Sequence, residues 1–77
     1  MKAYVPIVYL RRGVPTKFPV LLAQNLKCAV DEFLLRHREY SLAVPLKGRE
    51  FYTTVTGQHS VVYTRRIVLM DVGLERK

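Results

Sequence analysis

Hydrophobic residues in the middle of the chain predict one amphipathic helix. Between residues 26 and 37 the residues of one face recur at the i, i+3, i+4, i+7 spacing of an α-helix. They are Leu26, Ala29, Val30, Phe33, Leu34 and His37. Asn25 precedes this run and is a favourable N-cap residue. We therefore expect a helix from Asn25 to about Glu39.

Four other segments have the composition of β-strands. They are rich in β-branched and aromatic residues or alternate between apolar and polar positions, and they are residues 3–10, 42–46, 51–56 and 61–72. Proline cannot donate a hydrogen bond to a neighbouring strand, so Pro6 and Pro45 predict that the first two are edge strands. The last two contain no proline and are expected in the centre of the sheet.

Residues 17–23 allow two interpretations. The segment Lys-Phe-Pro-Val-Leu-Leu-Ala can form a short extended strand. It can also form the first turn of a helix capped by Thr16, since Pro19 is tolerated near a helix start. The extended form is favoured slightly.

These elements predict a small α+β domain with the order β-α-β-β-β, or ββαβββ if residues 17–23 are extended. The sheet is expected to be twisted and mainly antiparallel, with the helix packed on one face. With 77 residues, the chain has the length of one domain covering residues 1–77. Residues 73–77 are expected to be a frayed tail.

Basic residues exceed acidic ones by 13 to 6, which gives a net charge of +7. No acidic residue occurs in residues 1–30, and none occurs between Glu50 and Asp71. Three acidic residues lie in or just after the predicted helix, where Lys27 with Asp31 and Glu32 with Arg36 have the i, i+4 spacing of ion pairs. The positive surplus is therefore expected on the loops and the sheet.

The composition also narrows the class of protein. A single cysteine excludes an internal disulfide and a cysteine-based zinc site. No segment approaches the roughly 18 consecutive apolar residues of a membrane helix, and the first residues do not resemble a signal peptide. We expect a protein of a reducing compartment, the cytoplasm, that does not bind membranes.

No arrangement of residues in the sequence points to catalysis. Cys28 and His37 are nine positions apart on the predicted helix and would face opposite sides. His59 and Ser60 are adjacent but lack a visible carboxylate to orient the histidine. The sequence has no metal-ligand spacing and no glycine-rich phosphate loop. We therefore expect no catalytic residues, no metal site, no cofactor and no enzymatic activity.

Aromatic and basic residues on the predicted sheet form a candidate binding surface. If Phe51 faces the helix, Tyr52 faces solvent, and Tyr63 and Arg65 are expected to join it on that face. Sheets that bind single-stranded nucleic acid present this combination of side chains. The candidate residues, including loop positions, are Arg11, Arg12, Lys17, Arg49, Tyr52, Tyr63, Arg65 and Arg66. A purely solubilising role for these charges is an equally simple interpretation.

Two hypotheses about the partner follow from the charge. The first is a nucleic acid or a nucleoprotein complex. The second is an acidic patch on a host protein, contacted by a small inhibitor or adaptor of the type that phages and mobile elements encode. A structural subunit of a large assembly is a third possibility. Whether the protein is a monomer or a homodimer stays open.

Overall fold

The fold contains six β-strands and one α-helix within residues 1–74, which are the residues described by the computed structural model. In chain order the elements are β1 (Lys2–Tyr9), β2 (Thr16–Lys17), β3 (Leu21–Ala23), α1 (Leu26–Arg36), β4 (Tyr40–Pro45), β5 (Glu50–Thr56), a 3₁₀ turn (Gln58–Ser60) and β6 (Val62–Leu74). The expected α+β class is confirmed. Residues 17–23 are mostly extended, so the longer of the two expected element orders is the better description.

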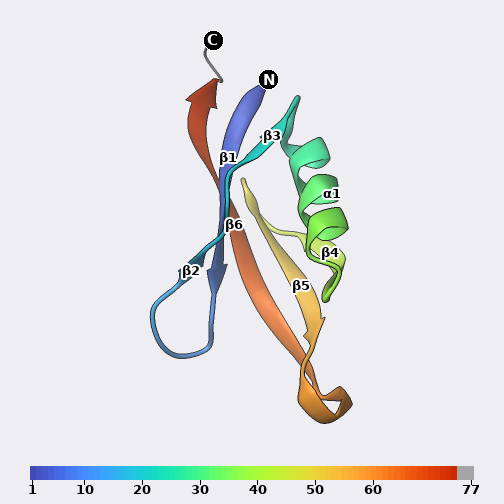
Figure 1. The fold of residues 1–77 in the computed structure, drawn as a ribbon. Helices are drawn as coiled ribbons and strands as arrows, with labels where there is room; N and C mark the ends of the chain where they lie inside the picture. The colour runs from blue at the N-terminus through green and yellow to red at the C-terminus, as the bar shows by residue number, and fades with distance from the viewer. Residues whose placement is uncertain (75–77) are drawn as a thin grey trace.

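All strand pairs are antiparallel, and the main path through the sheet is β2-β1-β6-β5-β4. β3 pairs with β1 as well, at the opposite end of that strand from β2. Helix α1 packs on one side of this sheet, and the other side carries no helix (Figure 1). The predicted central positions of β5 and β6 and the edge position of β4 are confirmed.

Helix α1 begins where the sequence predicts and ends earlier. The side-chain Oδ1 of Asn25 accepts a hydrogen bond of 2.9 Å from the backbone N–H of Cys28, which confirms Asn25 as the N-cap. The last helical residue is Arg36, not Glu39. His37 closes the helix because its N–H bonds to the Phe33 carbonyl, and its own carbonyl accepts from Tyr40 N–H, which starts β4.

The prediction that Pro6 marks an edge strand is wrong, because β1 lies between β6 and the β2–β3 segment. In an antiparallel strand the N–H and C=O of one residue point to the same neighbour. The Pro6 carbonyl accepts from Phe18 N–H at 2.9 Å, so the side without a donor faces the gap between β2 and β3. The proline is tolerated inside the sheet because its neighbouring strand is interrupted there.

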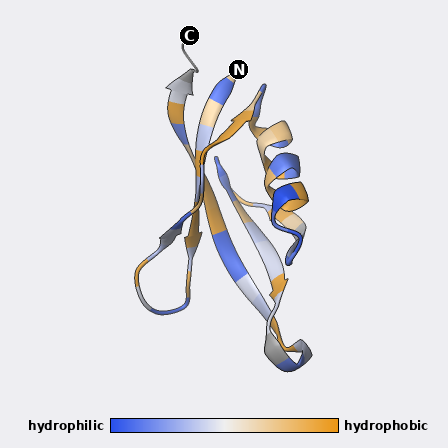
Figure 2. Cartoon of the chain, in the orientation of Figure 1, coloured by the Kyte–Doolittle hydropathy of each residue, from blue (hydrophilic) through white to orange (hydrophobic). Residues whose placement is uncertain are grey.

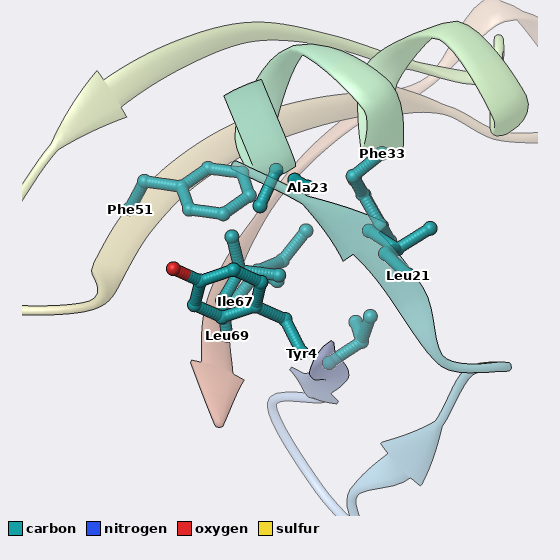
Figure 3. Close-up of a cluster of buried hydrophobic side chains, with 9 residues drawn as sticks. Tyr4, Leu21, Ala23, Phe33, Phe51, Ile67 and Leu69 are labelled. Carbon is teal, nitrogen blue, oxygen red and sulfur yellow. The ribbon is translucent and has the colours of Figure 1, made fainter. Parts of the chain in front are cut away.

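Side chains from the helix and from four strands form the hydrophobic core (Figure 3). The core residues, each at most 4% exposed, are Tyr4, Val8, Leu21, Ala23, Ala29, Phe33, Phe51, Ile67 and Leu69. Phe33 is fully buried and reaches from α1 toward Phe51, with ring centres 6.1 Å apart. This core occupies only one side of the sheet, and the other side is left for contacts with solvent or partners.

The molecule is elongated, with extents of 44 × 23 × 23 Å. The start of β1 and the end of β6 lie side by side at one end of the molecule, and the β5–β6 hairpin extends toward the other (Figure 1). Gly73 and Leu74 belong to β6 and pair with Ala3 and Lys2, so the prediction of a frayed tail is wrong for these two residues. Residues 75–77, the rest of that predicted tail, lie outside the described residues.

Candidate functional site

The pairing of β1, β6 and β5 brings two tyrosines and one arginine into a single row. Arg66 on β6 lies opposite Tyr9 on β1 and opposite Tyr52 on β5. Residues paired across antiparallel strands point to the same face of the sheet. Here that face is the one without the helix, because the neighbouring core residues Ile67 and Phe51 point toward α1. We call it the open face.

The expectation that Tyr63 and Arg65 share the face of Tyr52 is wrong. Phe51 pairs with Ile67, which fixes the register and places Arg65 opposite Thr53 and Tyr63 opposite Val55. Side chains alternate along a strand, so Tyr63 and Arg65 follow Ile67 to the helix side. Arg66, and not Arg65, stands beside Tyr52.

Arg66 makes two contacts on the open face. Its guanidinium carbon lies 4.5 Å from the centre of the Tyr9 ring, within the range of a cation–π interaction. Its Nη1 is 3.5 Å from Oε1 of Glu50. Both charged side chains are more than one third exposed, so this ion pair is screened by water and contributes little to stability. The guanidinium stays accessible to another anion.

A shallow hollow of about 590 Å³ surrounds this row. Three arginines and three tyrosines contribute to its lining, together with apolar residues and a threonine. The lining residues are Tyr9, Leu10, Arg11, Tyr52, Val62, Tyr63, Thr64, Arg65 and Arg66. No acidic residue lines it. The hollow therefore combines positive charge with aromatic rings, and it lies where the loop after β1 meets the β5–β6 hairpin.

On the helix side of the same strand, Arg65 lies over the Tyr63 ring at 5.0 Å and donates from Nη1 to the Thr64 carbonyl at 3.2 Å. Arg65 also influences Tyr40, which is half-buried at the start of β4. Burial raises the pKa of the Tyr40 phenol above its ordinary value of 10.0, and the negative charge of Glu39 raises it further. The positive charge of Arg65 opposes both effects.

The remaining predicted residues lie outside the hollow. Arg12 in the β1–β2 connection and Lys17 in β2 are exposed, and neither lines it. Arg49 lies in the turn before β5 and its Nη2 is 3.7 Å from Oδ2 of Asp71. It lines a separate apolar groove of about 360 Å³ between α1 and the β4–β5 region. Five of the predicted residues thus line the hollow: Arg11, Tyr52 and Arg66, and, from the helix side of β6, Tyr63 and Arg65. The other three lie apart from it.

Sequence reasoning missed Tyr9 and Glu50, which both contact Arg66. Tyr9 is 57 positions from Arg66, and nothing in a single sequence fixes which strands pair over such a separation. From the sequence, Glu50 is only the acid that precedes a long stretch without acidic residues. Its pairing with Arg66 follows from the β5–β6 register, which places Glu50 opposite Val68, two residues along the same face.

Positive and negative side chains on helix α1 pair with each other, as predicted. Lys27 Nζ lies 3.2 Å from Asp31 Oδ2, and Arg36 Nε lies 2.7 Å from Glu32 Oε2. Both predicted i, i+4 pairs are confirmed, so the charge of the helix face is largely cancelled. The positive surplus in residues 1–74 lies on the loops and strands, including the hollow.

The arrangement suits binding of an extended anion through charge and ring stacking. Within residues 1–74, no group of three or more His, Cys, Asp or Glu side chains is placed to hold a metal ion. No helix in that range is long and apolar enough to cross a membrane. Comparison with protein families, with curated proteins and with solved structures found no match to this chain.

Proposed function

We propose that this protein is a non-enzymatic binding protein for nucleic acid, alone or within a nucleoprotein complex, and that it holds a single strand across the open face. The observation that carries the proposal is the Tyr9–Arg66–Tyr52 row, in which a guanidinium lies between two tyrosines on three adjacent strands. Arginine binds phosphate through several N–H donors, and an exposed ring stacks with any base.

The spacing of the row is suited to a single strand of nucleic acid that runs across the β-strands of the sheet. Adjacent strands are about 4.8 Å apart, so Tyr9 and Tyr52 are separated by roughly 10 Å. That separation leaves room for bases at each tyrosine with a phosphate near Arg66. Tyr52 is 42% exposed and Arg11 is exposed in the neighbouring loop, so both can reach such a ligand.

The test is a fluorescence-anisotropy titration with labelled single-stranded RNA, single-stranded DNA and duplex DNA at several salt concentrations. Each phosphate contact on a single strand contributes about −0.7 to the slope of log affinity against log salt. Arg11→Ala and Arg66→Ala together should weaken binding and flatten that slope by about 1.4. The control for each single change is Arg36→Ala, which removes one positive charge as Arg11→Ala or Arg66→Ala alone does, but lies on the helix, beside Glu32.

Tight binding near physiological salt, with a preference for single strands, supports the proposal. Binding that disappears by about 150 mM salt, is equal for all three ligands and is reduced equally by the helix variant reflects only the net charge of +7. That result would overturn the proposal and favour an acidic protein surface as the partner.

A further inference from the structure

Part of the open face is apolar rather than basic. Six side chains from three adjacent strands form this region, which we call the apolar patch: Ala3, Val5, Ile7, Leu22, Val68 and Met70. Strand pairing brings them together, since Val5 lies opposite Met70, Ile7 opposite Val68, and Ala3 opposite Leu22. Leu22 and Met70 are 38% and 40% exposed, and the other four are half-buried.

The strands beneath the patch are apolar on both faces. In β1 the residues Tyr4, Pro6 and Val8 are buried on the helix side of the sheet, while Val5 and Ile7 between them point to the open face. Strands with one solvent-exposed face alternate between apolar and polar residues. Continuous apolar runs are typical of strands that are covered on both faces. The hydropathy colouring shows the change along β6, where a hydrophobic middle segment gives way to a hydrophilic one toward the hairpin (Figure 2).

We propose that the apolar patch is covered by the same patch of a second copy of this chain, in a symmetric dimer. In a two-fold contact a surface meets itself, so it must be uncharged or must carry matched opposite charges. The six patch residues carry no charge. The two charged residues paired beside them on this face have opposite signs, Lys17 next to Ile7 and Glu50 next to Val68. The patch is therefore suited to contact with an identical copy without like-charge repulsion at the contact itself.

The patch does not suit the ligand proposed for the neighbouring row. Its six side chains offer no donor for a phosphate and no aromatic ring for a base, whereas the Tyr9–Arg66–Tyr52 row beyond Ile7 and Val68 offers both. Sheets that stack face to face lie about 10 Å apart, joined by apolar side chains of this kind. The dimer does not depend on nucleic-acid binding and leaves one basic row in each copy at the border of the contact.

The size of the patch sets the strength of the dimer. Three strands about 4.8 Å apart and five residues of about 3.3 Å each give a footprint of roughly 240 Å². This is well below the roughly 600 Å² per partner, or 1,200 Å² in total, that the smallest stable complexes bury. The dimer is therefore weak and depends on concentration. Because each copy carries +7, added salt screens the repulsion between them and strengthens the dimer.

Sedimentation velocity from about 10 µM to about 1 mM, at low and high salt, tests the proposal. We expect a shift from the 9.0 kDa monomer to twice that mass as concentration rises, and more dimer at high salt. Met70→Asp should remain monomeric throughout that range. Leu35→Asp, which places the same charge at a 63% exposed position on the helix, should dimerise like the wild type.

Far-UV circular dichroism establishes that each variant is folded. If Met70→Asp is not folded, Val5→Thr provides a second test, since it keeps the shape of the side chain and replaces one methyl group of the patch by a hydroxyl. It should reduce the dimer fraction several-fold. A wild-type protein that stays at 9.0 kDa at every concentration and salt would overturn the proposal. A dimer that Met70→Asp leaves intact, or one that dissociates with added salt, would overturn it equally.

Discussion

Arg66 and Tyr9 are neighbours across strands β6 and β1, and the Arg66 guanidinium carbon lies 4.5 Å from the centre of the Tyr9 ring. On its other side the same guanidinium lies 3.5 Å from the Glu50 carboxylate. The Arg66 guanidinium thus already contacts the Tyr9 ring and the Glu50 carboxylate. A phosphate that binds Arg66 has to compete with Glu50, whereas the ring contact keeps the guanidinium in place for it.

This competition predicts that Glu50→Gln strengthens nucleic-acid binding. The change removes the competing charge and nearly preserves side-chain shape. An exposed ion pair contributes about 0.2–1 kcal/mol, which corresponds to an affinity gain of up to about fivefold. Anisotropy titration with single-stranded RNA at fixed salt measures the effect. Glu32→Gln makes the same charge change beside Arg36 on the helix and should leave the affinity nearly unchanged. Equal gains for both variants would show that only net charge matters.

The exposed ring of Tyr52 is predicted to stack on a base. Replacing it by alanine removes the stacking surface, and such changes cost about 1–3 kcal/mol per base in single-strand binding. Tyr52→Ala should therefore reduce affinity at least fivefold, while Tyr52→Phe, which keeps the ring, should stay close to the wild type. The slope of affinity against salt should be the same in all three proteins, since no charge changes. A loss of similar size in the phenylalanine variant would point to the hydroxyl group instead of stacking.

Local structure in this chain was largely predictable from the sequence. Asn25 as N-cap, the i, i+4 ion pairs on the helix and the long final strand all depend on residues close in sequence, and each is confirmed. The position of β1 was not predictable from Pro6, because the interruption of the neighbouring segment at residues 18–20 decides whether proline is tolerated.

The sequence predicted which types of residue form the candidate site, but not which of them share a face of the sheet. Strand alternation shows that Arg65 and Arg66 lie on opposite faces, but it does not say which of them joins Tyr52. The pairing of Phe51 with Ile67 decides this, since a register shifted by one residue would exchange the two faces. Tyr9 joins the row through pairing with a strand at the other end of the chain, which no local pattern contains.

The Asn25 cap is predicted to stabilise the whole domain, because α1 supplies Ala29 and Phe33 to the core. Asn25→Ala removes the acceptor for the Cys28 N–H and should lower the free energy of unfolding by about 1 kcal/mol. Urea denaturation measures this as a lower midpoint with an unchanged slope. Asn25→Asp keeps an acceptor and should retain most of the stability. Gln24→Ala, at the exposed position just before the cap, should have little effect, and a loss equal to that of Asn25→Ala would contradict the capping role.

The half-buried phenol of Tyr40 is predicted to make the folded protein less stable at high pH. Burial and the charge of Glu39 raise the pKa of Tyr40 above 10.0 in the folded protein, although Arg65 partly opposes them. The folded state therefore keeps the phenol proton at a pH where the unfolded chain has released it. Because the folded state then binds more protons than the unfolded chain, the free energy of unfolding falls as pH rises above 10.0. Below pH 10.0 the contribution of Tyr40 to stability is fully present.

Two variants separate this effect from the ionisation of other groups. Tyr40→Phe has no phenol to ionise, so its free energy of unfolding, measured by urea denaturation at a series of pH values, should fall less steeply above pH 10.0 than that of the wild type. Glu39→Gln removes one cause of the raised pKa and should give an intermediate slope. An absorbance titration at about 295 nm should show that Tyr40→Phe lacks one phenol that ionises above pH 10.0 in the wild type. If the stability curves of the wild type and Tyr40→Phe stay parallel above pH 10.0, the pKa of Tyr40 is not raised by folding. Its environment is then more hydrated than its position beside Phe33 and Phe18 indicates.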